Sequence, residues 1–199
     1  NMLTRILLPY VRLESKLTKL SLRALVWLVF IMSLIGQYAF IGMSYGSDEG
    51  LFLMQARMLT DGIYPMLDFY SKDLPYFLII YGWLMKIFGF NLFVSRTIGY
   101  VFGSVIAVLI FKLVYKLYQN KGVALVSVLL FMTSRLYLVE ASPLSSPGHG
   151  QTSLLFLMLA MYTIYSNFER FKGYQVFVQS MCLVGCLGLA VWCRLPAIA

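Results

Sequence analysis

Charged side chains are scarce in this sequence. They make up 12% of the 199 residues, whereas hydrophobic residues make up 60%. Soluble domains carry about a quarter charged residues, so a composition this apolar excludes an ordinary soluble domain. Several apolar runs approach the roughly 20 residues that a membrane-spanning helix requires. The sequence therefore predicts an all-α polytopic membrane protein.

Histidine and cysteine are also rare, which leaves little material for a metal site. The single histidine is His149, and the three cysteines, Cys182, Cys186 and Cys193, all lie in one apolar run. Cysteines in such a run are most simply small packing residues. No group of residues has the spacing of metal ligands, so a divalent metal cofactor stays possible but is not supported.

Carboxylates are few, and most of them are in one stretch of the chain. Five of the eight lie between positions 44 and 75, namely Asp48, Glu49, Asp61, Asp68 and Asp73. This polar stretch separates apolar segments, and such a loop is where a membrane protein is expected to carry out chemistry.

The net charge of +8 does not indicate nucleic-acid binding. The basic residues lie at the ends of apolar runs and do not cluster as in a groove-binding surface. Such flanking charges orient membrane helices, with the basic side in the cytoplasm. A basic, amphipathic segment at 1–22 is therefore expected in the cytoplasm. Residues 23–199 are expected to form a transmembrane domain that stops inside an apolar stretch, as in a fragment of a longer chain.

About five transmembrane helices are expected, with an outer loop at 44–94 after the first. They are placed at about 23–43, 95–117, 122–140 and 151–168, and from 174 onward. Residues 76–90 have two interpretations, a further span or an element embedded on the outer side. Their uninterrupted apolar run is only about 10 residues, which is typical of re-entrant or interfacial segments. If they spanned, the later lysines would face outside, against the positive-inside bias, so we favour the embedded element.

Small residues recur along one face of the span expected at 95–117. Gly99, Gly103 and Ala107 are each four residues apart. Such a stripe lets the backbones of two helices approach closely, so it predicts a packing surface.

Asp48 and Glu49 follow the first predicted span, at the start of a helix expected to run to about Thr60 and to end at Asp61-Gly62. Two interpretations are open. Acids in a first helical turn favour the helix macrodipole, which is a structural role. A carboxylate at the outer membrane surface can also act as general base on an incoming hydroxyl or amine. Spacing alone favours the structural interpretation.

Basic residues near the outer side form the second candidate group, which comprises Lys72, Arg96, Arg135 and Arg194. Lys72 and Arg96 can also be interface anchors that reach lipid headgroups. Arg135 and Arg194 lie within or at the ends of apolar spans, where ionisable residues are costly and more often functional. The planar fork of arginine binds two phosphate oxygens at once, so cations beside these carboxylates suit a lipid-phosphate substrate. We include Asp68 among the expected substrate-binding residues.

Several short motifs follow one another in a characteristic order. DEG comes after the first span, then YPMLDFYSKDLPY and FGFNLFVSR, then an inward span ending in lysines, and finally GLAVWCRLPA. In this order the chain resembles the N-terminal part of the polyprenyl-phosphate-sugar-dependent membrane glycosyltransferases of the GT-C fold. The nearest group is the superfamily of protein O-mannosyltransferases and lipid A aminoarabinose transferases. The resemblance covers about 42–199.

The resemblance implies roles for individual residues. Asp48 would be the catalytic base, with Glu49 beside it, and the first outer loop would form juxtamembrane helices. Lys72 matches the lysine of a Lys-x-Pro element that binds phosphate or substrate, although this chain has one residue more before the proline. Arg194 matches a basic residue near the donor phosphate. The family often has a second carboxylate at the start of the fourth span, where this chain has His-Gly-Gln.

These expectations define one enzymatic hypothesis and one alternative. The enzyme would be an inverting glycosyltransferase, multi-pass in the plasma (inner) membrane. It would transfer a sugar from a polyprenyl-phosphate donor to an acceptor glycan, lipid or protein on the periplasmic or extracellular side. Asp48 would deprotonate the acceptor, while Arg194, Lys72 and Arg96 would stabilise the charge of the departing phosphate. The alternative is a non-enzymatic transporter or lipid flippase module, which does not explain why carboxylates crowd one outer loop.

Overall fold

The computed structural model describes residues 20–39, 48–64, 67–68, 76–134, 149–167, 181 and 184–185. Within these ranges the secondary structure is helical and has no strand, which confirms the predicted all-α class. The helices are α2 (Leu22–Tyr38), α3 (Asp48–Thr60), α4 (Tyr76–Phe88), α5 (Leu92–Tyr118), α6 (Lys121–Met132) and α8 (His149–Asn167).

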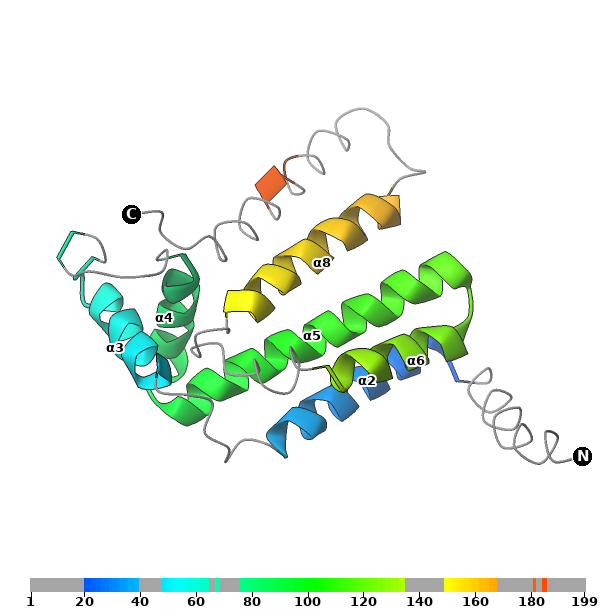
Figure 1. The fold of residues 1–199 in the computed structure, drawn as a ribbon, viewed down its shortest axis with the longest axis horizontal. Coiled ribbons are helices and arrows are strands. Elements are labelled where there is room, and N and C mark those ends of the chain that lie inside the picture. The colour runs from blue at the N-terminus through cyan, green and yellow to red at the C-terminus, as the bar shows by residue number, and fades with distance from the viewer. Residues whose placement is uncertain are drawn as a thin grey trace, which may run out of the picture.

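Helix α5 is the longest, and the other helices are arranged around it (Figure 1). Helices α2, α6 and α8 lie along its length, whereas α3 and α4 are grouped at the end where it begins. Helix α2 runs antiparallel to α5. The Tyr38 hydroxyl at its end lies 2.9 Å from the Thr97 hydroxyl near the start of α5, and Lys121 Nζ donates to Leu20 O at 2.8 Å. The segment between α2 and α5 therefore starts and ends at the same end of the bundle.

Polar residues explain where the helices begin. The side-chain oxygens of Ser21, Asn91 and Asn120 accept hydrogen bonds of 2.8–3.2 Å from N–H groups in the first turns of α2, α5 and α6. Such N-caps satisfy donors that have no partner inside the helix. Gln119 has a left-handed backbone, with φ of 52°, and with Asn120 it forms the turn that folds α6 back on α5.

The predicted stripe of small residues on α5 is a packing surface for α2. Gly103 is buried against Gln37, whose Oε1 lies 2.7 Å from the point where a Gly103 Cβ would be. Ala107 belongs to an apolar cluster shared by α2, α5 and α6, together with Leu25, Val29, Phe111, Ala124 and Val128. Helix α8 packs on another part of α5, where Leu155 meets Ile106 and Leu109.

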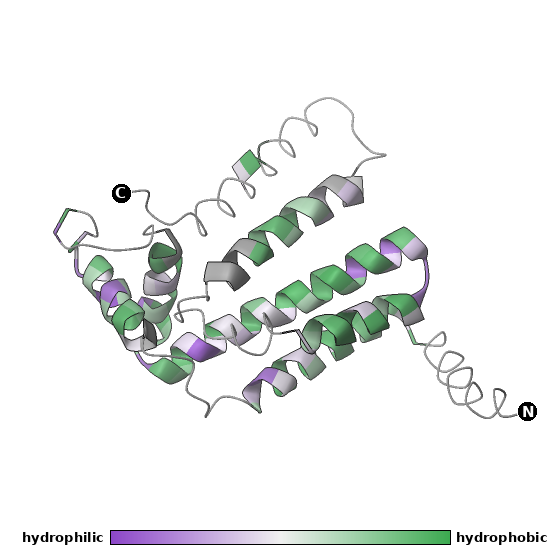
Figure 2. Ribbon diagram, viewed as in Figure 1, coloured by the Kyte–Doolittle hydropathy of each residue, from purple (hydrophilic) through white to green (hydrophobic). Residues whose placement is uncertain are grey.

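Helix α5 is the one helix in the described ranges that is long and apolar enough to cross a membrane. Its 27 residues extend about 40 Å, compared with about 30 Å for a bilayer core. Helices α2, α6 and α8, at the places of three other predicted spans, have 17, 12 and 19 residues. Figure 2 shows hydrophobic residues over most of α5 and α6 and hydrophilic residues at the turn between them. The fifth span lies largely outside the described residues, so five transmembrane helices stay a prediction.

Residues 76–90 contain the short helix α4. Its 13 residues extend about 20 Å, which is less than the thickness of a bilayer core. Gly89 has φ of 108° and donates its N–H to Met85 O at 2.7 Å, which ends the helix. Helix α4 packs against α3 and against the first turns of α5. This length is compatible with the embedded element, but the described part of α6, at the place of a predicted span, is no longer than α4, so the embedded position of α4 stays a prediction.

Candidate functional site

Asp48 and Glu49 are the first two residues of α3, as the sequence predicts, and the positions of their side chains lie outside the description. The helix continues to Thr60, and Gly62 then takes a left-handed φ of 87°. This is the residue type that such a helix end favours, so the predicted boundary at Asp61-Gly62 is confirmed. A position in the first turn is compatible with both interpretations of the two acids, the macrodipole and the general base.

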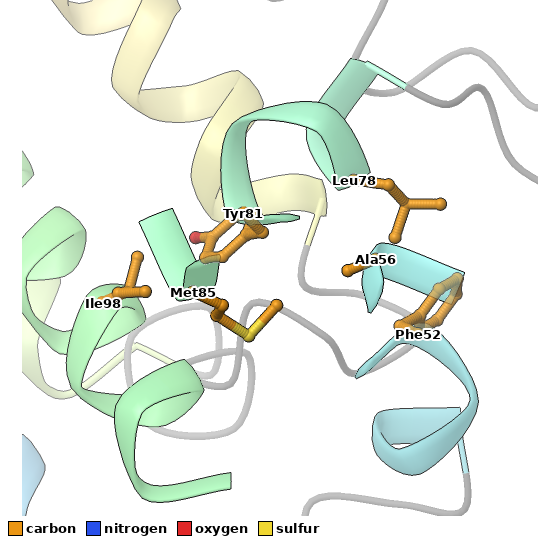
Figure 3. Packing of buried hydrophobic residues seen from close by; sticks show 6 residues of the cluster. All are labelled: Phe52, Ala56, Leu78, Tyr81, Met85 and Ile98. Carbon is orange, nitrogen blue, oxygen red and sulfur yellow. The ribbon is translucent and has the colours of Figure 1, made fainter. Parts of the chain in front are cut away.

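An apolar cluster fixes α3 against its neighbours (Figure 3). It combines buried side chains of α3, α4 and α5, which are Phe52, Ala56, Leu78, Tyr81, Met85 and Ile98. These side chains pack closely across the three helices, and the sum of their van der Waals contacts resists displacement of any one of them. The acidic first turn of α3 is therefore carried by a helix with a defined position relative to α4 and to the start of α5.

Gly82 permits the close crossing of α3 and α4. A Cβ at this position would lie 2.9 Å from Ala56 O and 3.1 Å from Thr60 Cγ2. Real Cβ atoms do not approach backbone oxygens this closely, so any larger residue forces the helices apart. Lys86 Nζ adds a long contact of 3.5 Å to Thr60 O, which ties the end of α4 to the last turn of α3.

Asp68 has a local structural role in the loop after α3. Its Oδ2 accepts a hydrogen bond from Tyr64 N at 2.7 Å, and its own N–H donates to Tyr64 O at 2.9 Å. Aspartate commonly closes turns through such side-chain to backbone bonds. The carboxylate therefore stabilises the turn, and its predicted part in substrate binding stays a prediction.

Arg96 lies in the second turn of α5 and is partly buried. Its neighbour Thr97 donates to Phe93 O at 2.8 Å and lies 2.9 Å from the Tyr38 hydroxyl. A threonine hydroxyl has one proton, so Tyr38 is the donor in the second bond. This bond fastens the last turn of α2 to the part of α5 that carries Arg96.

The first turn of α3 and Arg96 belong to helices that meet at one end of the bundle, and that their side chains form one site stays a prediction. Lys72, Arg135 and Arg194 lie outside the described residues, so their convergence on this end stays a prediction. Within the described ranges, no three His, Cys, Asp or Glu residues come together as possible metal ligands.

An apolar groove between α4 and the first half of α5 was not predicted. Its volume is about 380 Å³, which is within the usual range of small-molecule sites. Residues of both helices line it, which are Leu84, Phe88, Phe93, Val94, Thr97, Ile98, Val101 and Phe102. The sequence shows aromatic residues on both sides of the turn at Gly89, but only the folded chain brings them around one groove.

Comparison with known families gives a match that begins just before α4 and extends past α8. The model of the family described as dolichyl-phosphate-mannose-protein mannosyltransferase matches residues 73–198, which is more than half of the chain. The matched region includes Arg96 and Arg194 and begins after Asp48, Glu49 and Lys72. Comparisons with curated proteins and with solved structures gave no match.

Proposed function

The chain belongs to the dolichyl-phosphate-mannose-protein mannosyltransferase family and is thus a membrane glycosyltransferase of the mannosyltransferase type; we propose that its α3–α4 end carries the active site. In this proposal the donor is a sugar on a polyprenyl phosphate. The acceptor is a hydroxyl or amine of a glycan, lipid or protein. Family membership favours this function over the transporter or flippase alternative.

One observation carries the proposal. The apolar cluster holds α3, whose first two residues are Asp48 and Glu49, against α4 and against the start of α5 near Arg96. Carboxylates and a cation are therefore carried by elements that meet at one end of α5. Among the described residues, α5 is the only helix that is long and apolar enough to span a membrane. A base for the acceptor and a cation for a phosphate are the two groups that sugar transfer from a lipid phosphate requires.

The proposed reaction is a single displacement. Asp48 takes the proton of the acceptor hydroxyl or amine while the acceptor atom attacks the anomeric carbon. The bond from that carbon to the phosphate oxygen breaks, and the phosphate leaves with the electron pair. Arg96, with Lys72 and Arg194, stabilises the charge that develops on the leaving phosphate. Attack opposite to the leaving group inverts the anomeric centre.

The apolar groove beside the start of α5 supports a lipid-linked donor. It lies between α4 and α5, at the same end of the bundle as α3, and its lining is apolar apart from the Thr97 hydroxyl. Phe88 and Phe93 are 66% and 61% exposed at its margins, as suits contact with a bilayer. In our proposal the first isoprenoid units of the donor occupy this groove, which keeps the phosphate near Arg96.

Substituting Asp48 with Asn in the full-length enzyme tests the catalytic assignment. Asn keeps the shape of Asp but cannot accept the proton, so transfer should fall by about 10²–10⁴-fold while donor-lipid binding is retained. Asp61→Asn, at the exposed end of α3, is the matched control and should keep near wild-type activity. If Asp48 acts only on the macrodipole, Asn also suits a helix start and activity should barely change. Wild-type turnover by Asp48→Asn with saturating donor would remove Asp48 from the mechanism.

Impermeant thiol labelling tests the side of the membrane on which α3 and α4 lie. Leu67 and Tyr118 are 84% and 67% exposed and lie at opposite ends of the described bundle. In a background without the native cysteines, Leu67→Cys should react in intact cells and Tyr118→Cys only after permeabilisation. The reverse pattern would place the α3–α4 end in the cytoplasm. This would contradict the orientation predicted from the basic residues that precede the first helix.

A further inference from the structure

The far end of α5 carries two lysines that each lie beside a tyrosine of α8. Lys112 Nζ is 5.8 Å from the ring centroid of Tyr162, and Lys116 Nζ is 5.4 Å from that of Tyr165. Lys116 Nζ also donates to Tyr165 O at 2.9 Å. The two lysine–tyrosine pairs are about one helical turn apart on both helices. They therefore form two neighbouring contacts between α5 and α8, which run parallel.

These pairs lie where the apolar contact between α5 and α8 ends. One to two turns earlier, Ile106 and Leu109 of α5 pack on Leu155 of α8. Tyr115 and Tyr118 of α5 occupy the same last turns as the lysines. Tyrosines concentrated at one level mark the depth of the membrane–water interface. The two ammonium groups therefore lie at the level of lipid headgroups.

The surrounding charge at this end is positive. Lys121 begins α6 and donates to Leu20 O at 2.8 Å, and Arg23 lies in the first turn of α2. Among the described residues, every Asp and Glu lies in α3 or in the loop after it, at the opposite end. A cationic headgroup such as choline would find no carboxylate partner here within the described ranges, whereas an anionic headgroup would find several cations.

The two lysines also keep donors for a ligand. An ammonium group has three N–H donors, and the bond to Tyr165 O uses one of those of Lys116. Tyrosine ring faces attract a cation but provide a weaker acceptor than an oxygen atom. The remaining N–H groups of the two lysines can donate to phosphate oxygens.

We propose that Lys112 and Lys116, with Tyr162 and Tyr165, form a binding site for the headgroup phosphate of an anionic phospholipid in the leaflet at this end. This site is separate from the proposed active site, which lies at the other end of α5. A bound lipid would bridge α5 and α8 and would add to the contacts that fix their relative position.

Native mass spectrometry of the delipidated full-length protein tests the proposal. Phosphatidylglycerol and phosphatidylcholine would be titrated separately as probes. A cation near a charged headgroup surface contributes about fivefold in affinity, so Lys112→Gln/Lys116→Gln should weaken phosphatidylglycerol binding about 25-fold. Phosphatidylcholine carries the same phosphodiester but no net charge, so it should bind less tightly to the wild type and lose less affinity in this variant. Replacing both lysines by Arg keeps the charge and should restore most of the affinity.

A charge-matched control separates this site from a general effect of net charge. Arg57→Gln/Lys86→Gln also removes two cations, from the α3–α4 end, and should leave phosphatidylglycerol affinity near that of the wild type. The proposal fails if this control loses as much affinity as the α5 variant, or if the α5 variant binds normally. It also fails if millimolar inorganic phosphate displaces the lipid, because the site would then bind free phosphate.

Discussion

Replacing Gly103 with alanine tests how tightly α2 is packed on α5. The new Cβ would lie 2.7 Å from Oε1 and 2.8 Å from Nε2 of Gln37, which is well inside normal contact distance. Gln37 is 1% exposed, and its Nε2 donates to Tyr100 O at 3.2 Å. The amide therefore cannot turn away without breaking this bond or pushing α2 outward.

The expected cost follows from these contacts. Overpacking of this kind destabilises by about 1–3 kcal/mol, and losing the bond to Tyr100 O adds about 1 kcal/mol. Alanine recovers about 0.5–1 kcal/mol relative to glycine in a helix interior. Gly103→Ala should therefore lower the free energy of unfolding by about 1–3 kcal/mol. In a Gln37→Ala background the obstacle is gone, and the same substitution should be neutral or slightly stabilising.

A double-mutant cycle on the full-length protein in lipid or detergent measures this coupling, through unfolding by heat or by a denaturing detergent. We expect a coupling free energy of about 2–3 kcal/mol between positions 37 and 103. Gly50→Ala is the control, because a Cβ at this exposed position in α3 meets nothing within 4 Å. It should be neutral or stabilising. Equal losses for Gly103→Ala in both backgrounds would refute the argument that Gln37 sets the distance between α2 and α5.

Three further predictions concern other contacts between helices. Gly82→Ala should destabilise the protein by about 1–2 kcal/mol and reduce transfer activity, because its Cβ would lie 2.9 Å from Ala56 O. An unchanged melting temperature would contradict the close crossing of α3 and α4. Tyr38→Phe should cost about 0.5–1.5 kcal/mol in thermal unfolding, because Thr97 loses the donor at 2.9 Å; a neutral effect would mean that water replaces it. Gln55 is 6% exposed and its Oε1 has no partner in the described ranges, so Gln55→Met should be neutral or stabilising by melting temperature. A marked loss would show that the amide is needed.

Much of the fold could be predicted from the sequence, because the properties that decide it act over short distances along the chain. Low charge and long apolar runs predicted a helical membrane protein. The acid-rich segment predicted a helix to about Thr60, and Asp61-Gly62 predicted its end. The order of short motifs led to the family whose model matches residues 73–198. Hydropathy, caps and motif order can all be read from neighbouring residues.

The candidate site is different, because its geometry depends on how helices cross. The packing of α3 on α4 depends on the absence of a side chain at Gly82, and the groove depends on two helices meeting at their ends. Gln37 bonds to a carbonyl 63 residues away, and Lys116 to one 49 residues away. Which residues meet across a helix pair depends on crossing angle and register, and these follow from the packing of all the helices together. Local sequence does not contain that information, so only the tertiary structure decides these contacts.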